Sequence, residues 1–189
     1  MKNTLYGVMV TGVVLAAGVF VLNSYMYDEK QGEGLPQDFR AVTFTLSGEP
    51  VTLVDGVAQV QTPFTGASIT TVRYFGNEVT HDVDGDGVDD VVFLVTQDAG
   101  GSGIFFYAVG ALKREGGYIG TSGVLLGDRI APQTTEKGEG RMVIVNYADR
   151  APGEPMAARP SIGKSIWLLL DTQTLQFGEV VRDFEGESL

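Results

Sequence analysis

Short apolar runs that alternate with polar residues follow one another along most of the chain. Val42, Phe44 and Leu46 are separated by polar residues, and this two-residue period is typical of a strand with one buried face. The same kind of pattern predicts further strands at residues 51–54, 57–60, 69–75, 104–112, 118–126, 142–147, 165–170 and 175–181. The run at 91–96 is apolar toward both faces, which predicts a central strand.

Turn residues separate these runs. Asp55-Gly56, between two strand-like runs, is typical of a tight β-hairpin. Ser47–Pro50, Gly76-Asn77 and Gly116-Gly117 are predicted to turn the chain or to end a strand. No stretch after residue 27 shows a convincing helical period. The sequence therefore predicts a mainly β fold, an antiparallel meander that forms a sandwich or an open barrel.

The N-terminus has a different pattern. Residues 5–22 contain no charged side chain, and as a helix they would span about 27 Å, close to the thickness of the hydrocarbon core of a bilayer. We expect residues 1–27 to form one transmembrane helix that anchors the protein to a membrane. A cleaved signal peptide is the alternative, although its apolar region is usually only about 7–15 residues long.

Charges on the two sides of this segment predict its orientation. Lys2 precedes the apolar run and Asp28-Glu29 follow it, so the positive-inside rule places the N-terminus in the cytoplasm. A polar linker with Gly and Pro is predicted at 28–39, and a domain at 40–189. We therefore predict a single-pass membrane protein with a periplasmic or extracellular β domain.

Composition excludes several classes of function. The formal net charge is −11, and an acidic surface repels phosphate backbones, so we expect no nucleic-acid partner. The chain has no cysteine, which excludes disulfides, thiolate metal sites, cysteine nucleophiles and a lipid-modified N-terminal cysteine.

The most specific chemical pattern is the acidic segment at residues 82–90. Asp82, Asp84 and Asp86 stand at positions 1, 3 and 5 of a tight loop, and Gly87 stands at position 6. Calcium prefers such a set of hard oxygen ligands. An EF-hand would need a glutamate at position 12 and flanking helices. Phe93 stands at position 12 within a strand-like run, so a strand leaves this loop.

The pattern D-x-D-x-D-G-x-x-D leading into a strand resembles the calcium loops of FG-GAP and VCBS repeats and of integrin α-subunit propellers. This resemblance implies Ca²⁺ bound by Asp82, Asp84, Asp86, the carbonyl of Val88 and Asp90. The longer stretch 82–156 resembles a group of uncharacterised bacterial membrane-anchored and lipoprotein domains. The alternative is an acidic turn without metal, which repulsion among the carboxylates disfavours.

A second candidate site comes from a short internal echo. Asp128-Arg129 and Asp149-Arg150 each follow a strand-like run and precede Ala-Pro within three residues. Arg129 and Arg150 could together bind an anion or contact a partner. In the alternative interpretation each aspartate caps a turn and each arginine pairs locally.

Two function hypotheses follow. The first is a calcium-binding β domain with a binding or structural role in the cell envelope, where an envelope protein or polymer is its partner. The second is a small hydrolase of envelope polymers that uses two carboxylates facing across a cleft. Trp167, the only tryptophan, has apolar neighbours, so we expect it in the core rather than on a sugar-binding surface. The biological ligand and the oligomeric state are not predicted.

Overall fold

The computed structural model describes residues 34–61 and 69–181, and the fold below refers to these residues. They form one 3-10 turn, η1 (Phe39–Ala41), and twelve strands. The strands are β1 (Thr43–Leu46), β2 (Glu49–Thr52), β3 (Val57–Gln61), β4 (Ile69–His81), β5 (Asp90–Asp98), β6 (Phe105–Arg114), β7 (Gly117–Gly120), β8 (Val124–Asp128), β9 (Ala131–Lys137), β10 (Val143–Asp149), β11 (Ile162–Asp171) and β12 (Gln176–Glu179).

The predicted anchor at 1–27 and most of the predicted linker lie outside the described residues. In the part of the chain that is described, no helix combines the length and the apolar character needed to cross a bilayer. The compact unit that contains the strands begins at Leu35, earlier than the predicted start at residue 40. The backbone N–H of Tyr118 donates to the carbonyl of Pro36, so this segment already packs on the domain.

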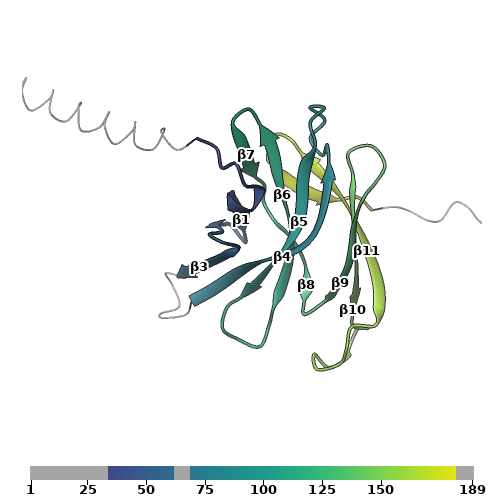
Figure 1. The fold of residues 1–189 in the computed structure, drawn as a ribbon. Coiled ribbons are helices and arrows are strands. Elements are labelled where there is room, and N and C mark those ends of the chain that lie inside the picture. Colours follow the sequence, from purple (N-terminus) through teal and green to yellow (C-terminus); the bar gives the residue numbers. More distant parts are fainter. Residues whose placement is uncertain (1–33, 62–68, 182–189) are drawn as a thin grey trace, which may run out of the picture. The chain divides into compact units, whose positions relative to one another are not determined.

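The strands form three sheets, and every pairing between them is antiparallel. The central sheet has the order β3-β4-β5-β6-β7, and β8 also pairs with β6; the second sheet is β12-β11-β10-β9, and β1-β2 form a separate hairpin. Figure 1 shows the three layers from β1, through β5 and β6, to β10 and β11. The prediction of a mainly β, antiparallel fold is confirmed, and the sheets do not close into a barrel. Sequential strands are neighbours from β3 to β7 and from β9 to β12.

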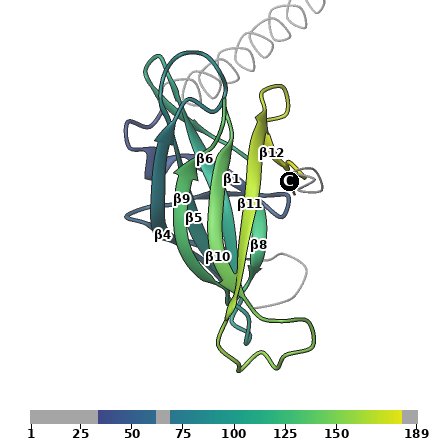
Figure 2. The same cartoon turned by 90° about the vertical axis from the view of Figure 1, so that its right-hand side faces the viewer.

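The central strands β5 and β6 are buried on both faces. On one face, Val92 and Leu94 belong to the apolar cluster that includes Val145 and Leu168 of the second sheet. On the other face, Val91, Phe93 and Val95 belong to the cluster with residues of the β1-β2 hairpin, Phe44, Leu46 and Val51. In Figure 2 the second sheet faces the viewer and β5 and β6 lie behind it. The prediction of a central strand at 91–96 is confirmed.

Two of the predicted turns differ in part from expectation. Asp55 and Gly56 have φ angles of 52° and 79°, as a tight hairpin turn requires. However, Val54 and Val57 form the one bridge of this hairpin. Beyond it the two strands separate, so that β2 pairs with β1 and β3 pairs with β4. Gly76-Asn77 does not end a strand, because β4 continues to His81 through an irregularity in its pairing with β5.

The predicted strand at 118–126 divides into β7 and β8, which pair with different parts of β6. Buried Thr121 lies between them, and the backbone N–H of Gly110 donates to its hydroxyl at 2.8 Å. The backbone N–H of Thr121 still donates to the carbonyl of Gly110, at 3.0 Å, so the hydroxyl replaces only the carbonyl acceptor that a regular strand would offer β6 here. The break follows from this side-chain contact, which the sequence pattern does not reveal.

Two features of the second sheet differ from expectation. Strand β9 was not predicted, because its residues are mostly polar and it forms the sheet edge; Pro132 fits an edge, where a missing N–H is tolerated. The prediction that Trp167 lies in the core is wrong. Ile166 and Leu168 are buried, while Trp167 between them is partly exposed, because neighbouring strand residues point to opposite faces.

Candidate metal site

The acidic loop joins β4 to β5, which pair with each other up to the two ends of the loop. His81 at the end of β4 and Asp90 at the start of β5 pair across the sheet, so residues 82–89 must reverse the chain between them. Gly85 and Gly87 have φ angles of 83° and 87°, a conformation that costs glycine little. Buried Val83 fixes one side of the loop in the apolar cluster.

Aspartate side chains organise the backbone of the loop. The Asp82 carboxylate accepts hydrogen bonds from the N–H groups of Gly85 and Gly87, at 2.7 and 3.0 Å. Asp84 Oδ1 accepts from the N–H of Asp86, and Asp86 Oδ1 accepts from the N–H of Val88. Such local bonds are typical of aspartate-rich turns. They hold each carboxylate close to the turn of the loop.

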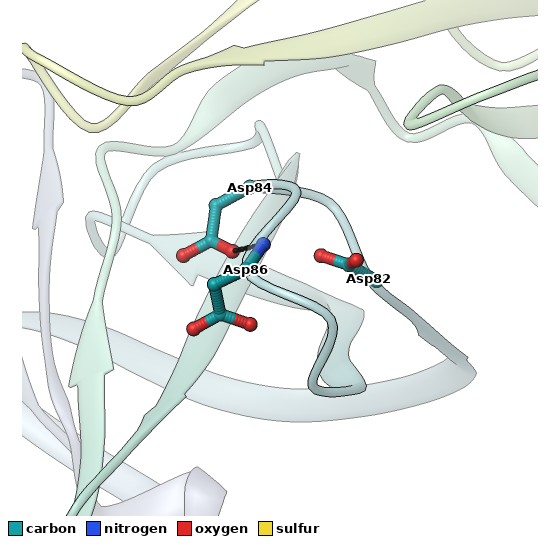
Figure 3. A group of neighbouring side chains, drawn as sticks. All are labelled: Asp82, Asp84 and Asp86. Atoms are coloured by element: carbon teal, nitrogen blue, oxygen red, sulfur yellow. Dashed lines mark hydrogen bonds between the residues drawn. The ribbon is translucent and has the colours of Figure 1, made fainter.

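The three carboxylates converge. One oxygen each from Asp82, Asp84 and Asp86 lies within 4.8 Å of the others, and Figure 3 shows the three side chains gathered at the turn. Two oxygens on opposite sides of a Ca²⁺ ion lie about 4.6–5.2 Å apart, because each Ca–O distance is about 2.3–2.6 Å. The group therefore fits a metal ion, and a hard divalent cation suits its all-oxygen donor set.

Asp90 lies apart from this group. It is fully buried, and its carboxylate oxygens accept from the N–H groups of Val83 and Lys113, at 3.1 and 2.8 Å. Burial raises the pKa of Asp90 to about 6, against the effect of these two hydrogen bonds, and the charges of Asp84 and Asp86 raise it further. Asp90 joins the loop to β6. Its direct ligation of calcium stays a prediction, as does that by the carbonyl of Val88.

Gly140 and Arg141, in the segment that precedes β10, support the back of the loop. Arg141 Nη1 lies 3.1 Å from the carbonyl oxygen of Asp84 and 3.4 Å from that of Val83. A Cβ on Gly85 would lie 2.9 Å from Arg141 Cδ, so the loop leaves room for this side chain. His81 Nε2 bonds the carbonyl of Gly140 at 2.8 Å. These contacts fix the loop from the segment that precedes β10.

Arg114 contacts the front of the site. Its Nη2 donates to Asp84 Oδ2, and its Nη1 lies 3.4 Å from Asp86 Oδ2. The sequence analysis did not identify Arg114 or Arg141. Their placement depends on strand register: Val91 pairs with Ala111, so the end of β6 runs past the loop. The sequence around residue 114 does not indicate how β6 is aligned with β5, so the contact of Arg114 with the loop could not be predicted.

The arginines of the second candidate site make local contacts. Arg129, with a φ angle of 49°, pairs with the neighbouring carboxylate of Asp128 at 3.1 Å. Arg150 donates to the carbonyl oxygens of Ala158 and Arg129, at 2.8 and 3.0 Å. The structure thus brings Arg150 to the backbone of Arg129, and these contacts agree with the local-pairing interpretation. An anion bound between the two guanidinium groups stays a prediction.

A pocket of about 610 Å³ lies beside η1 and the Asp55-Gly56 turn, and no residue of the acidic loop lines it. Asp38 and Asp55 both line it, together with Arg40 and Tyr74. Hydrogen bonds from the Arg40 side chain and backbone hold the pKa of Asp38 below its usual value. A general acid in a glycosidase needs a raised pKa, so Asp38 is suited to pairing with Arg40 rather than to acid catalysis.

Comparison of the chain with models of known protein families, with curated proteins and with solved structures found no match. The likeness of residues 82–90 to FG-GAP and VCBS loops therefore stays a prediction from those residues. The case for a metal depends on the geometry of Asp82, Asp84 and Asp86.

Proposed function

We propose that this protein is a calcium-binding β domain, displayed outside the cytoplasm on an N-terminal membrane anchor, with a binding or structural role in the cell envelope. The observation that supports the calcium part is the convergence of three aspartate carboxylates on a hydrogen-bonded turn between two paired strands. Calcium bound there stabilises the junction of β4 and β5, because it neutralises carboxylates that otherwise repel one another.

The non-enzymatic role is preferred to the hydrolase. The loop carboxylates accept hydrogen bonds from the loop backbone, Asp90 is buried beneath it, and Asp38 is paired with Arg40. These groups are committed to structure. Hydrolysis needs two carboxylates that face a bound substrate across a cleft, one of them with a raised pKa.

Calcium is expected to raise the melting temperature of the full chain, purified in mild detergent, relative to excess chelator. Extracellular calcium modules bind at about 10⁻⁴–10⁻³ M, so 1 mM Ca²⁺ stabilises by about 0.4–1.4 kcal/mol if it binds only the folded state. For a chain of this size that is a shift of about 1–5 °C. Calorimetric titration should show a binding heat.

Isosteric variants make the test specific. Asp84→Asn and Asp86→Asn keep an oxygen for the loop hydrogen bonds but remove a charged ligand, and they should abolish most of the calcium response. Asp89→Asn is the matched control, because Asp89 is an exposed residue of the same loop outside the converging group. Identical melting curves in calcium and in chelator, together with no heat, would refute calcium binding.

A further inference from the structure

The guanidinium of Arg114 lies against the metal loop although Arg114 belongs to β6. It contacts Asp84 Oδ2 through Nη2 and Asp86 Oδ2 through Nη1. The Arg114 side chain is 30% exposed, whereas that of Asp84 is 6% exposed. One cationic group thus links two of the three converging carboxylates from the solvent side.

Arg114 contacts the two carboxylate oxygens that accept no hydrogen bond from the loop backbone. In Asp84 and Asp86, Oδ1 accepts an N–H of the loop, and Oδ2 accepts from Arg114. The Oδ2 atoms of Asp84 and Asp86 accept no backbone N–H of the turn, so they have more free lone pairs for a metal ion than the Oδ1 atoms. The guanidinium of Arg114 therefore occupies one oxygen of each side chain that a metal ion could use.

The two cations cannot both use these oxygens at little cost. A divalent ion and a guanidinium in contact with the same carboxylates lie a few ångströms apart, where like charges repel strongly. Arg114 has room to leave, since it is partly exposed and its other contact is the carbonyl of its neighbour Lys113, at 2.7 Å. Arg141 contacts backbone carbonyls on the loop and not these Oδ2 atoms, so metal binding does not require it to move.

We propose that Arg114 is a built-in competitor of the metal: its guanidinium neutralises Asp84 and Asp86 in the metal-free protein and is displaced when a divalent cation binds. This inference rests on the proposed function, because it assigns the regulation of the same site. Arg114 keeps the acidic loop folded without metal, and it weakens the apparent affinity, since each binding event must break its two contacts.

Removing the guanidinium should therefore tighten calcium binding. We expect Arg114→Gln to lower the calcium Kd about 3- to 5-fold, the upper part of the range for a solvent-exposed ion pair. Arg114→Lys keeps the charge but lacks the planar fork that reaches two carboxylates, so its Kd should fall between those of the wild type and Arg114→Gln. Calorimetric titration of the full chain with calcium chloride measures all three.

Lys113→Gln is the matched control for net charge. Lys113 is the neighbour of Arg114 on the same strand, and its ammonium lies 4.3 Å from the ring centroid of Tyr118 rather than on the loop carboxylates. Its loss removes the same charge without freeing Asp84 or Asp86, so its Kd should stay within about 2-fold of the wild type. Equal tightening in both variants would show a general charge effect and overturn the competition.

Melting curves give a second, independent readout. In excess chelator, Arg114→Gln should melt below the wild type, because its loop carboxylates have lost their partner; in saturating calcium the two should melt together. An unchanged or weaker Kd in Arg114→Gln, with normal binding by the wild type, overturns this inference and leaves the proposed function standing. No calcium heat in any of these proteins overturns both. If Arg114→Gln does not fold, Arg114→Lys carries the test.

Discussion

Asp90, the last carboxylate of the acidic pattern, has contacts in the fold that do not depend on a metal. Its two oxygens accept backbone N–H groups from Val83 and Lys113 in a fully buried position. An asparagine there would turn one acceptor into an NH₂ donor that faces another donor. A buried unsatisfied group costs about 1–3 kcal/mol.

Asp90→Asn is therefore expected to lower the free energy of unfolding by about 1–3 kcal/mol in chelator and in calcium alike. Denaturant titration in both conditions measures it, with Asp89→Asn as the exposed control. If Asp90 were instead chiefly a metal ligand, the variant would lose the difference between calcium and chelator and would match the wild type once calcium is removed.

At the scale of residues, the sequence predicted what depends on local spacing. Positions 1, 3 and 5 of a turn converge in any such loop, so Asp82, Asp84 and Asp86 could be identified without a fold. Arg114, Arg141 and the hydrogen bonds of Asp90 could not, because each comes from a strand that the register of β5 and β6 brings to the loop. The same spacing rule does not predict that the guanidinium of Arg114 contacts the loop.

At the scale of elements, β5 connects the two apolar clusters, since its alternate residues enter one or the other. Phe93 is fully buried and packs edge-on against Phe39 and Phe44, with ring centroids 5.4 Å apart in both pairs. Trp167 lies in the second sheet, on the other side of β5. The two clusters should therefore unfold together.

Phe93→Ala is expected to lower the free energy of unfolding by about 3–5 kcal/mol, and the full shift should be visible in the fluorescence of Trp167. Phe75→Ala is the matched control: Phe75 is 47% exposed, so its loss should cost far less. Near-ultraviolet circular dichroism of the tyrosines should give the same unfolding midpoint as the fluorescence of Trp167. Two separated transitions would show that the layers unfold independently.

The strength of the apolar pattern decided which elements could be predicted. An apolar run identified β5, because a strand covered on both faces has few polar positions. Strand β9 escaped, because an edge strand with Pro132 and mostly polar side chains looks like a loop. The division of residues 118–126 escaped because it depends on the contact of Thr121 with Gly110.

For the whole molecule, the sequence predicted the class of fold but not the order of its layers. The apolar strands β5 and β6 require cover on both faces, yet nothing in their pattern says that the β1-β2 hairpin covers one face and the β9–β12 sheet the other. That choice depends on contacts between segments far apart along the chain. Location is the other property of the whole chain, and it depends on the proposed anchor.

Protease added to spheroplasts of a bacterial host that expresses the full chain should digest the β domain, because the proposed anchor places it outside the cytoplasmic membrane. Immunodetection with an antibody against residues 69–181 measures the loss, and a cytoplasmic protein that stays intact is the control. Full protection of the domain, followed by digestion after detergent lysis, would contradict the proposed orientation.

The short segment that leads into the first strand has a mechanical consequence. Pro36 accepts a backbone hydrogen bond from Tyr118, and Gln37 donates to the carbonyl of Gly116. A pulling force that enters the domain from its N-terminal end is therefore first resisted by the β6–β7 hairpin, before it loads β1. Arg114, next to the turn of that hairpin, is also in contact with the acidic loop. Tension on the proposed anchor and a metal ion in the proposed site would thus act on neighbouring residues of the same hairpin.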